Sequence, residues 1–193
     1  MRFSAWITIS LLVIVNCFAA SSIKEQPKIA LALGGGAALG YAHLGVIQVL
    51  EEAGIVPDIV LGASIGSIVG AYYCAGLEHD QIVKEAENLG IFQLLDWKIG
   101  RLGFFEWKKV RRKVDKSLGG LMIEDLNPQL ICVATNLITG ERVKLEKGNL
   151  IDCMLASATI PGLYQPIEID GNMIGADFGF VIGCNTIHTG AGM

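Results

Sequence analysis

The sequence predicts an α/β fold, in which a mainly parallel sheet is covered by helices. Three observations support this prediction. Short apolar runs alternate with amphipathic segments of helical length. The first run, 28–33, is apolar after its first residue, as expected for a strand buried on both faces. Turns with two or more glycines join the first two runs to the segments that follow, in the order of a βαβ unit.

The individual elements follow from these patterns. The expected strands are 28–33, 58–61, 129–136, 142–146, 166–169 and 173–176. The expected helices are 41–53, 65–75, 80–89, 106–118 and 149–158. Gly54 and Gly76 end the first two helices, since glycine readily adopts the positive φ of a helix C-terminus. The sequence Asp170-Gly171-Asn172 is typical of a hairpin turn, and the aromatic stretch 90–103 is predicted to be irregular.

The composition fits a single globular domain. The chain has 193 residues, of which 52% are hydrophobic, and its net charge is −4. This length predicts one domain over 28–193. A chain with a net negative charge and no excess of basic residues is not expected to bind nucleic acid. Cys74, Cys132 and Cys153 lie in apolar stretches and are predicted to be small core residues.

The N-terminus has the pattern of a secretory signal peptide. Arg2 supplies the positive charge, and an apolar stretch from Ala5 to Val15 leads to small residues that end at Ala19. We expect 1–19 to be a cleaved signal peptide and 20–27 a linker. The protein is then exported, either to the periplasm or out of the cell. An uncleaved or lipid-modified anchor is the alternative.

The sequence Gly62-Ala63-Ser64-Ile65-Gly66 predicts a nucleophile elbow. A nucleophilic serine must project from a sharp turn between a strand and a helix, where glycines two residues away on each side relieve crowding. A predicted strand precedes Ser64 and a predicted helix follows it, so its context is the one that this mechanism requires. The alternative is a glycine-flanked turn that only packs a helix on the sheet.

A second glycine-rich turn, 34–40, also joins a strand to a helix. One interpretation is an oxyanion hole, in which backbone N–H groups of Gly34, Gly35, Gly36 and Ala37 face the substrate oxygen. The other interpretation is a dinucleotide-binding turn, which requires a small residue where Leu39 stands. Because both turns follow neighbouring parallel strands, we expect them to open on the same edge of the sheet.

The sequence offers few general bases for Ser64. Ser64, a later acid and His188 have the chain order of a histidine triad, but only one strand precedes the strand that leads into the elbow, unlike the α/β-hydrolase order. His43 is interpreted as a core or helix-capping residue, and His79 as solvated. A carboxylate held close to a serine can also act as its base. Asp177, which follows an apolar strand, is the candidate, whereas Asp170 fits a hairpin turn.

Four ordered motifs resemble the patatin-like phospholipases, particularly their small bacterial members, over residues 28–180. The motifs are LALGGGAALGYAHLGVIQVLEEAGI, GASIGSIVGAYY, ATNLITGE and LASATIPGLYQPIEIDG. The resemblance implies a three-layer α/β/α fold and hydrolysis of acyl esters in phospholipids or lysophospholipids by a Ser–Asp dyad. It implies Ser64 as nucleophile, Asp177 as general base and the loop at 34–37 as oxyanion hole, with neither metal nor cofactor.

Three positions depart from the family pattern. Leu39 stands where most members have Arg or Lys, and Ala37 where many have glycine. Phe178 follows the aspartate where glycine is usual, so a positive φ there would cost about 1–2 kcal/mol. The chain also ends soon after Asp177, whereas relatives continue, which suggests an incomplete C-terminus. The alternative function is therefore a non-catalytic lipid-binding remnant.

The segment 104–113 suggests a contact with membranes. Phe104, Phe105 and Trp107 precede a run of basic residues, Lys108–Lys113, on an amphipathic helix. Such a helix can lie on an anionic bilayer. The alternative, which the pattern favours, is a helix packed against the sheet with a solvated basic face.

Overall fold

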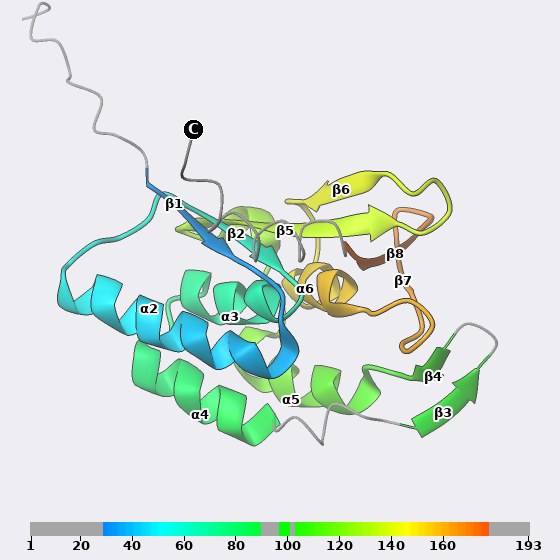
Figure 1. Cartoon of the computed structure of the whole chain (residues 1–193), viewed down its shortest axis with the longest axis horizontal. Helices are drawn as coiled ribbons and strands as arrows, with labels where there is room; N and C mark the ends of the chain where they lie inside the picture. Colours follow the sequence, from blue (N-terminus) through cyan, green and yellow to red (C-terminus); the bar gives the residue numbers. More distant parts are fainter. Residues whose placement is uncertain (1–28, 90–96, 101–102, 178–193) are drawn as a thin grey trace, which may run out of the picture.

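The computed structural model describes residues 29–89, 97–100 and 103–177 (Figure 1). The expected signal peptide and linker lie outside these ranges, as do Phe178, Cys184 and His188. None of the helices in the ranges described is long and apolar enough to cross a bilayer.

The main sheet is mixed and not mainly parallel as predicted, because its first three strands are parallel but the others pair antiparallel. Strand β1 pairs with β2, and β2 pairs with β5, both in parallel register. Strands β6 and β8 pair antiparallel with β5, and β7 forms a hairpin with β8. The strands are β1 (Ala30–Leu33), β2 (Ile59–Ala63), β5 (Gln129–Asn136), β6 (Arg142–Leu145), β7 (Ile167–Ile169) and β8 (Asn172–Ala176).

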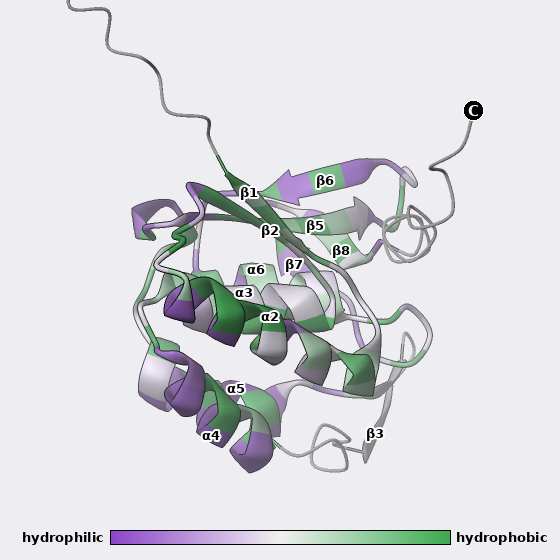
Figure 2. Ribbon diagram, turned by 60° about the vertical axis from the view of Figure 1, so that its left-hand side comes forward, coloured by the Kyte–Doolittle hydropathy of each residue, from purple (hydrophilic) through white to green (hydrophobic). Residues whose placement is uncertain are grey.

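The helices α3 and α6 pack directly against this sheet, and α4 and α5 lie farther from it (Figures 1 and 2). Helix α3 is buried on all sides, as an apolar helix in the centre of a fold should be. The Asn149 side chain accepts a hydrogen bond from the Asp152 N–H at 3.1 Å and so caps the start of α6. The helices are α2 (Tyr41–Glu52), α3 (Ile65–Cys74), α4 (His79–Leu89), α5 (Lys108–Leu118) and α6 (Leu150–Ala158), with 3₁₀ turns η1 (Ala37–Gly40) and η3 (Ile123–Asp125).

One stretch that was expected to be irregular contains strands. Strand β3 (Trp97–Gly100) pairs antiparallel with β4 (Gly103–Phe105). The backbone N–H of Phe105 also donates to the Leu163 carbonyl, and the Gln165 N–H donates to the Phe105 carbonyl, each at 3.0 Å. Because these partners lie far along the chain, no local pattern could indicate the second pairing.

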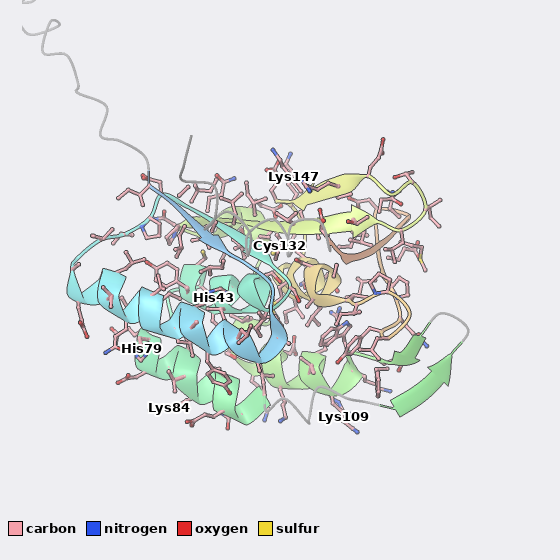
Figure 3. All side chains as sticks on the ribbon, viewed as in Figure 1. His43, His79, Lys84, Lys109, Cys132 and Lys147 are labelled. Carbon is pink, nitrogen blue, oxygen red and sulfur yellow. The ribbon has the colours of Figure 1, made fainter. Side chains whose placement is uncertain are left out.

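The cysteines of the described ranges are core residues, as predicted. Cys74, Cys132 and Cys153 are free and buried, and Cys132 belongs to strand β5 of the main sheet (Figure 3). Burial raises the pKa of the Cys74 and Cys153 thiols to about 12, and nearby acidic groups add to this effect at Cys153. These thiols are therefore protonated and unreactive at neutral pH.

Helix α5 buries its apolar stripe, as the favoured interpretation expected, but it packs mainly against α6 and not against the sheet. Trp107 is buried, donates from Nε1 to Thr159 Oγ1 at 2.7 Å, and stacks on Tyr164 with ring centroids 4.1 Å apart. Phe105 is also buried. The prediction that these two rings contact a membrane is therefore wrong, because both fill space inside the fold. Membrane contact through the basic run Lys108–Lys113 stays a prediction, and the Phe104 side chain lies outside the description.

Candidate active site

Ser64 occupies a strained turn between β2 and α3. Its backbone angles are φ 51° and ψ −121°, a conformation that non-glycine residues rarely adopt. Such strain persists only where the surrounding structure enforces it, and it is typical of a nucleophile elbow. The start of α3 at Ile65 also places the positive end of a helix next to Ser64, which favours a negative charge developing there.

Two buried hydroxyl groups hold this turn in place. The Ser64 N–H donates to Ser157 Oγ at 3.1 Å, and Ser157 Oγ donates to the Val133 carbonyl at 2.6 Å. Ser67 Oγ lies 2.6 Å from the Ser64 carbonyl oxygen and 2.9 Å from the Met154 carbonyl oxygen, and these two acceptors share its single proton. Helix α6 and strand β5 are thereby tied to the elbow. Neither serine was predicted as part of the site, although a small polar residue inside an apolar helix could have indicated each of them.

The glycines of the elbow are required sterically, as predicted. A Cβ atom on Gly62 would come within 2.6 Å of the Ser67 Cα atom. A Cβ atom on Gly66 would lie 2.1 Å from the Leu33 carbonyl oxygen and 2.7 Å from that of Gly34. Gly66 therefore allows the elbow helix to touch the end of β1, where the glycine-rich loop begins.

The glycine-rich loop leaves the sheet beside the elbow. Leu33 pairs with Gly62, so the loop starts at the level of Ala63, next to Ser64. Gly36, at φ 152°, and Ala37, at φ 47°, lead into η1. Successive backbone N–H groups around residues with positive φ can form a concave anion-binding surface. The side chain of Leu39 is 74% exposed and brings no charge to the loop.

His43 has a role that the sequence analysis did not assign. It lies on α2, half-buried (Figure 3), with Nε2 2.8 Å from the Gly34 carbonyl oxygen. A carbonyl oxygen can only accept, so Nε2 donates. The interpretation of His43 as a core or helix-capping residue is therefore corrected, because its ring orients the first carbonyl of the glycine-rich loop. The position of His43, one turn into the helix that follows the glycine-rich loop, could have indicated this contact.

The register of β5 shows how the remaining strands of the main sheet are arranged around the elbow. Cys132 and Val133 pair with both β2 and β6, and Ala134 and Thr135 pair with both β6 and β8. A strand has only two edges, so β6 occupies one edge of β5, while β2 and β8 follow each other along the other.

Strands β2 and β8 therefore meet end to end. Ala63 lies opposite Val133, and Ala176 lies opposite Ala134, which are consecutive residues of β5. Because β2 runs parallel to β5 and β8 antiparallel to it, their C-terminal ends point at each other. Ser64 and Asp177 are the next residues after these ends. The tertiary structure thus brings the two predicted catalytic residues to one junction, together with the start of the glycine-rich loop.

Asp177 is held at this junction by Arg142. The Asp177 side chain is 7% exposed, and its Oδ2 accepts a hydrogen bond from Arg142 Nε at 2.6 Å. Arg142 comes from β6, on the far edge of β5, and is 59% exposed. A charged hydrogen bond of this kind offsets part of the cost of burying a carboxylate. Arg142 could not be predicted as a partner of Asp177, because no local pattern in the sequence links the two residues.

The other candidate acid and base do not join this junction. Asp170, at φ 50°, and Gly171, at φ 74°, form the exposed turn between β7 and β8, which confirms the hairpin interpretation. His79 Nδ1 lies 3.0 Å from Asp80 Oδ1 at the start of α4.

These features define an α/β protein with a serine on a strand-to-helix elbow, beside a glycine-rich loop and a buried carboxylate. The sequence matches the patatin-like phospholipase family over residues 31–183, and the chain belongs to this family. An uncharacterized NTE family protein of Mycobacterium tuberculosis is 39% identical over 161 residues, which cover 82% of this chain and 44% of that protein.

More distant relatives agree with this assignment. Lysophospholipase NTE1 of Candida glabrata is 34% identical over 183 residues, covering 86% of this chain and 10% of the fungal protein. The chain thus spans less than half the length of these relatives. The crystal structure of VipD from Legionella pneumophila matches with a TM-score of 0.62 at 18% identity, over 78% of this chain and 46% of VipD. The type III effector protein ExoU matches with a TM-score of 0.50 at 19% identity, over 68% of this chain and 40% of ExoU. These matches confirm the predicted three-layer α/β class.

Proposed function

We propose that this protein is a lipid acyl hydrolase that cleaves carboxylic esters of phospholipids or lysophospholipids. The observation that carries this proposal is the end-to-end meeting of β2 and β8, which puts Ser64 and Asp177 at one junction beside the glycine-rich loop. Membership of the patatin-like phospholipase family supports a lipid ester as substrate. Relatives named as lysophospholipases support the same substrate class.

The mechanism assigns one role to each part of the junction. Asp177 accepts the proton of the Ser64 hydroxyl group while Oγ attacks the ester carbonyl carbon. Backbone N–H groups at 34–37 stabilise the negative charge that develops on the carbonyl oxygen. The bond to the alcohol breaks, and the alcohol leaves with the proton from Asp177. A water molecule then gives a proton to Asp177 and attacks the acyl-enzyme, and the fatty acid leaves as Ser64 recovers its hydrogen.

A fluorophosphonate probe, which reacts with activated serines, tests this function directly. We expect the folded protein to be labelled at Ser64 and the Ser64→Ala variant to be unlabelled, with labelled sites located by peptide mass spectrometry. Ser157→Ala is not a suitable control because its hydroxyl group holds the elbow, whereas the Ser117→Ala change, at a half-buried position on α5, should leave labelling intact. Well-folded protein that resists the probe would instead support the non-catalytic lipid-binding remnant.

Arg142 is expected to set the pH dependence of the reaction. Removing its positive charge in Arg142→Gln makes the neighbouring carboxylate easier to protonate, so the acidic limb of the kcat/KM profile should move to higher pH. At pH 6 we expect kcat/KM of Arg142→Gln to fall on the order of tenfold, because the variant changes both the charge beside the base and the position of the base. Arg142→Lys keeps the positive charge but lacks the planar guanidinium group, and it should shift the acidic limb of the kcat/KM profile less.

The matched control for this series is Arg112→Gln. Arg112 is exposed on α5, and its Nε donates only weakly, at 3.4 Å, to a carbonyl of its own helix. The pH profile of kcat/KM for Arg112→Gln should coincide with that of the parent protein. Identical acidic limbs for Arg142→Gln and Arg112→Gln would show that Arg142 does not act on the base.

A further inference from the structure

An apolar cavity opens beside the glycine-rich loop and runs between α2, α3 and α4. It holds about 100 Å³ of water-accessible space, and no charged side chain of the described residues lines it. Its wall on α3 consists of Ile65, Ile68, Val69 and Tyr72, which recur at helical spacing on one face. Because a helix rises about 1.5 Å per residue, these seven steps give the cavity a depth of about 10 Å.

The mouth of the cavity belongs to the candidate active site. Ala37, from the predicted oxyanion loop, and Ala38 line it and are exposed, and Tyr41 beside them is 48% exposed. Ile65, which directly follows Ser64, lines the same end. A carbonyl group held at this loop therefore has the cavity next to it.

The opposite end is closed by buried side chains. Tyr72 is 2% exposed and Ile82 is 1% exposed, and both line the cavity. The Tyr72 hydroxyl makes no hydrogen bond of normal geometry with the described residues. Burial raises the pKa of Tyr72 far above its usual range, an effect that Glu85 strengthens and nearby Ser117 opposes. The floor of the cavity is therefore uncharged at physiological pH.

We propose that this cavity binds the acyl chain of the substrate ester, with the carbonyl group at the glycine-rich loop and the methyl end toward Tyr72 and Ile82. The proposal rests on the proposed hydrolase function. A polar headgroup would lose its hydrogen bonds to water in this lining without replacement, whereas an alkyl chain gains free energy from its burial. The closed floor further implies that the cavity limits the length of the acyl chain that is cleaved well.

Ala86 on α4 offers a way to fill the cavity. It lines the cavity and is only partly buried, so a larger side chain there enters the space with little repacking. In Ala86→Phe, we expect the ratio of kcat/KM for p-nitrophenyl decanoate to that for p-nitrophenyl butyrate to fall by about tenfold or more, as for a pocket shortened by several methylene groups. Ala53→Phe, at the exposed C-terminus of α2 and outside the cavity, is the control and should keep the parent ratio.

A binding experiment separates this inference from the hydrolase function. The Ser64→Ala variant cannot turn over ester by the proposed mechanism, and in that background a fluorescence titration with cis-parinaric acid reports fatty-acid binding alone. Adding Ala86→Phe should weaken this binding by about tenfold or more, and adding Ala53→Phe should not. Thermal unfolding checks that each variant is folded, and Ala86→Leu replaces Ala86→Phe if the larger side chain prevents folding.

The outcomes are distinct. A protein that cleaves no ester but binds parinaric acid in an Ala86-dependent manner contradicts the hydrolase function and leaves the acyl site standing. Equal chain-length ratios and equal parinaric acid affinities for the Ala86 and Ala53 variants would overturn the acyl site, whether or not esters are cleaved.

Discussion

Asp177→Asn is expected to lower kcat/KM for ester hydrolysis by about 10²–10⁴-fold, the range that a general base contributes. The amide cannot accept the Ser64 proton but keeps nearly the same size. Because Asp177 also pairs with Arg142, the change leaves that guanidinium group without its anionic partner, so stability must be measured alongside activity. Steady-state kinetics with p-nitrophenyl butyrate, together with thermal unfolding, separates the two effects.

Two further variants make this prediction specific. Asp170→Asn changes another aspartate, which lies in the exposed hairpin turn, and should leave kcat/KM unchanged. His188→Ala tests the histidine triad that the chain order allows. Should His188→Ala abolish turnover while Asp177→Asn retains it, the Ser–Asp dyad is wrong and a histidine acts as the base.

Gly66→Ala is expected to damage both stability and activity. The added Cβ atom would lie 2.1 Å from the Leu33 carbonyl oxygen, and backbone on both sides must move to relieve this contact. Overpacking of this kind costs on the order of 1–3 kcal/mol of the free energy of unfolding. The same movement separates the elbow from the glycine-rich loop, and a displacement near 1 Å at a reaction centre can lower the rate by about 10²-fold.

Gly45→Ala is the matched control. Gly45 lies within α2, and apart from its chain neighbours and the backbone of its own helix, no heavy atom of the described residues lies within 4 Å of a Cβ atom placed there. Alanine should therefore stabilise the helix by about 0.5–1 kcal/mol without affecting hydrolysis. Urea unfolding and kcat/KM of the two variants provide the comparison, and a Gly66→Ala protein as stable and active as the parent would contradict the tight packing of the elbow.

Most of the helices and strands could be predicted because their signals are local. The apolar stripe of α5 and the glycine that ends α2 each depend on a few neighbouring residues. The observed elements β5 and α3 agree with the expected ranges to within a residue. The backbone pairing of Phe105 with Leu163 and Gln165 was missed because these partners lie far along the chain, where no local pattern indicates them.

The candidate site divides in the same way. Ser64 with Gly62 and Gly66 could be recognised because the steric demands of a sharp turn act over five consecutive residues. The supporting contacts could not be recognised. Ser157 and Arg142 reach Ser64 and Asp177 from elements far away in the chain. The rings of Phe105 and Trp107 were misassigned for a related reason, since their burial depends on Tyr164 and Thr159.

The sequence by itself determined the α/β class, the elbow around Ser64, the glycine-rich loop and the family to which the chain belongs, because these depend on short patterns with strong steric requirements. Only the tertiary structure decided that β2 and β8 share one edge of β5 and end facing each other. Strand pairing is set by hydrogen bonds and packing between segments far apart in the chain, so the position of Asp177 relative to Ser64 exists only in the folded sheet.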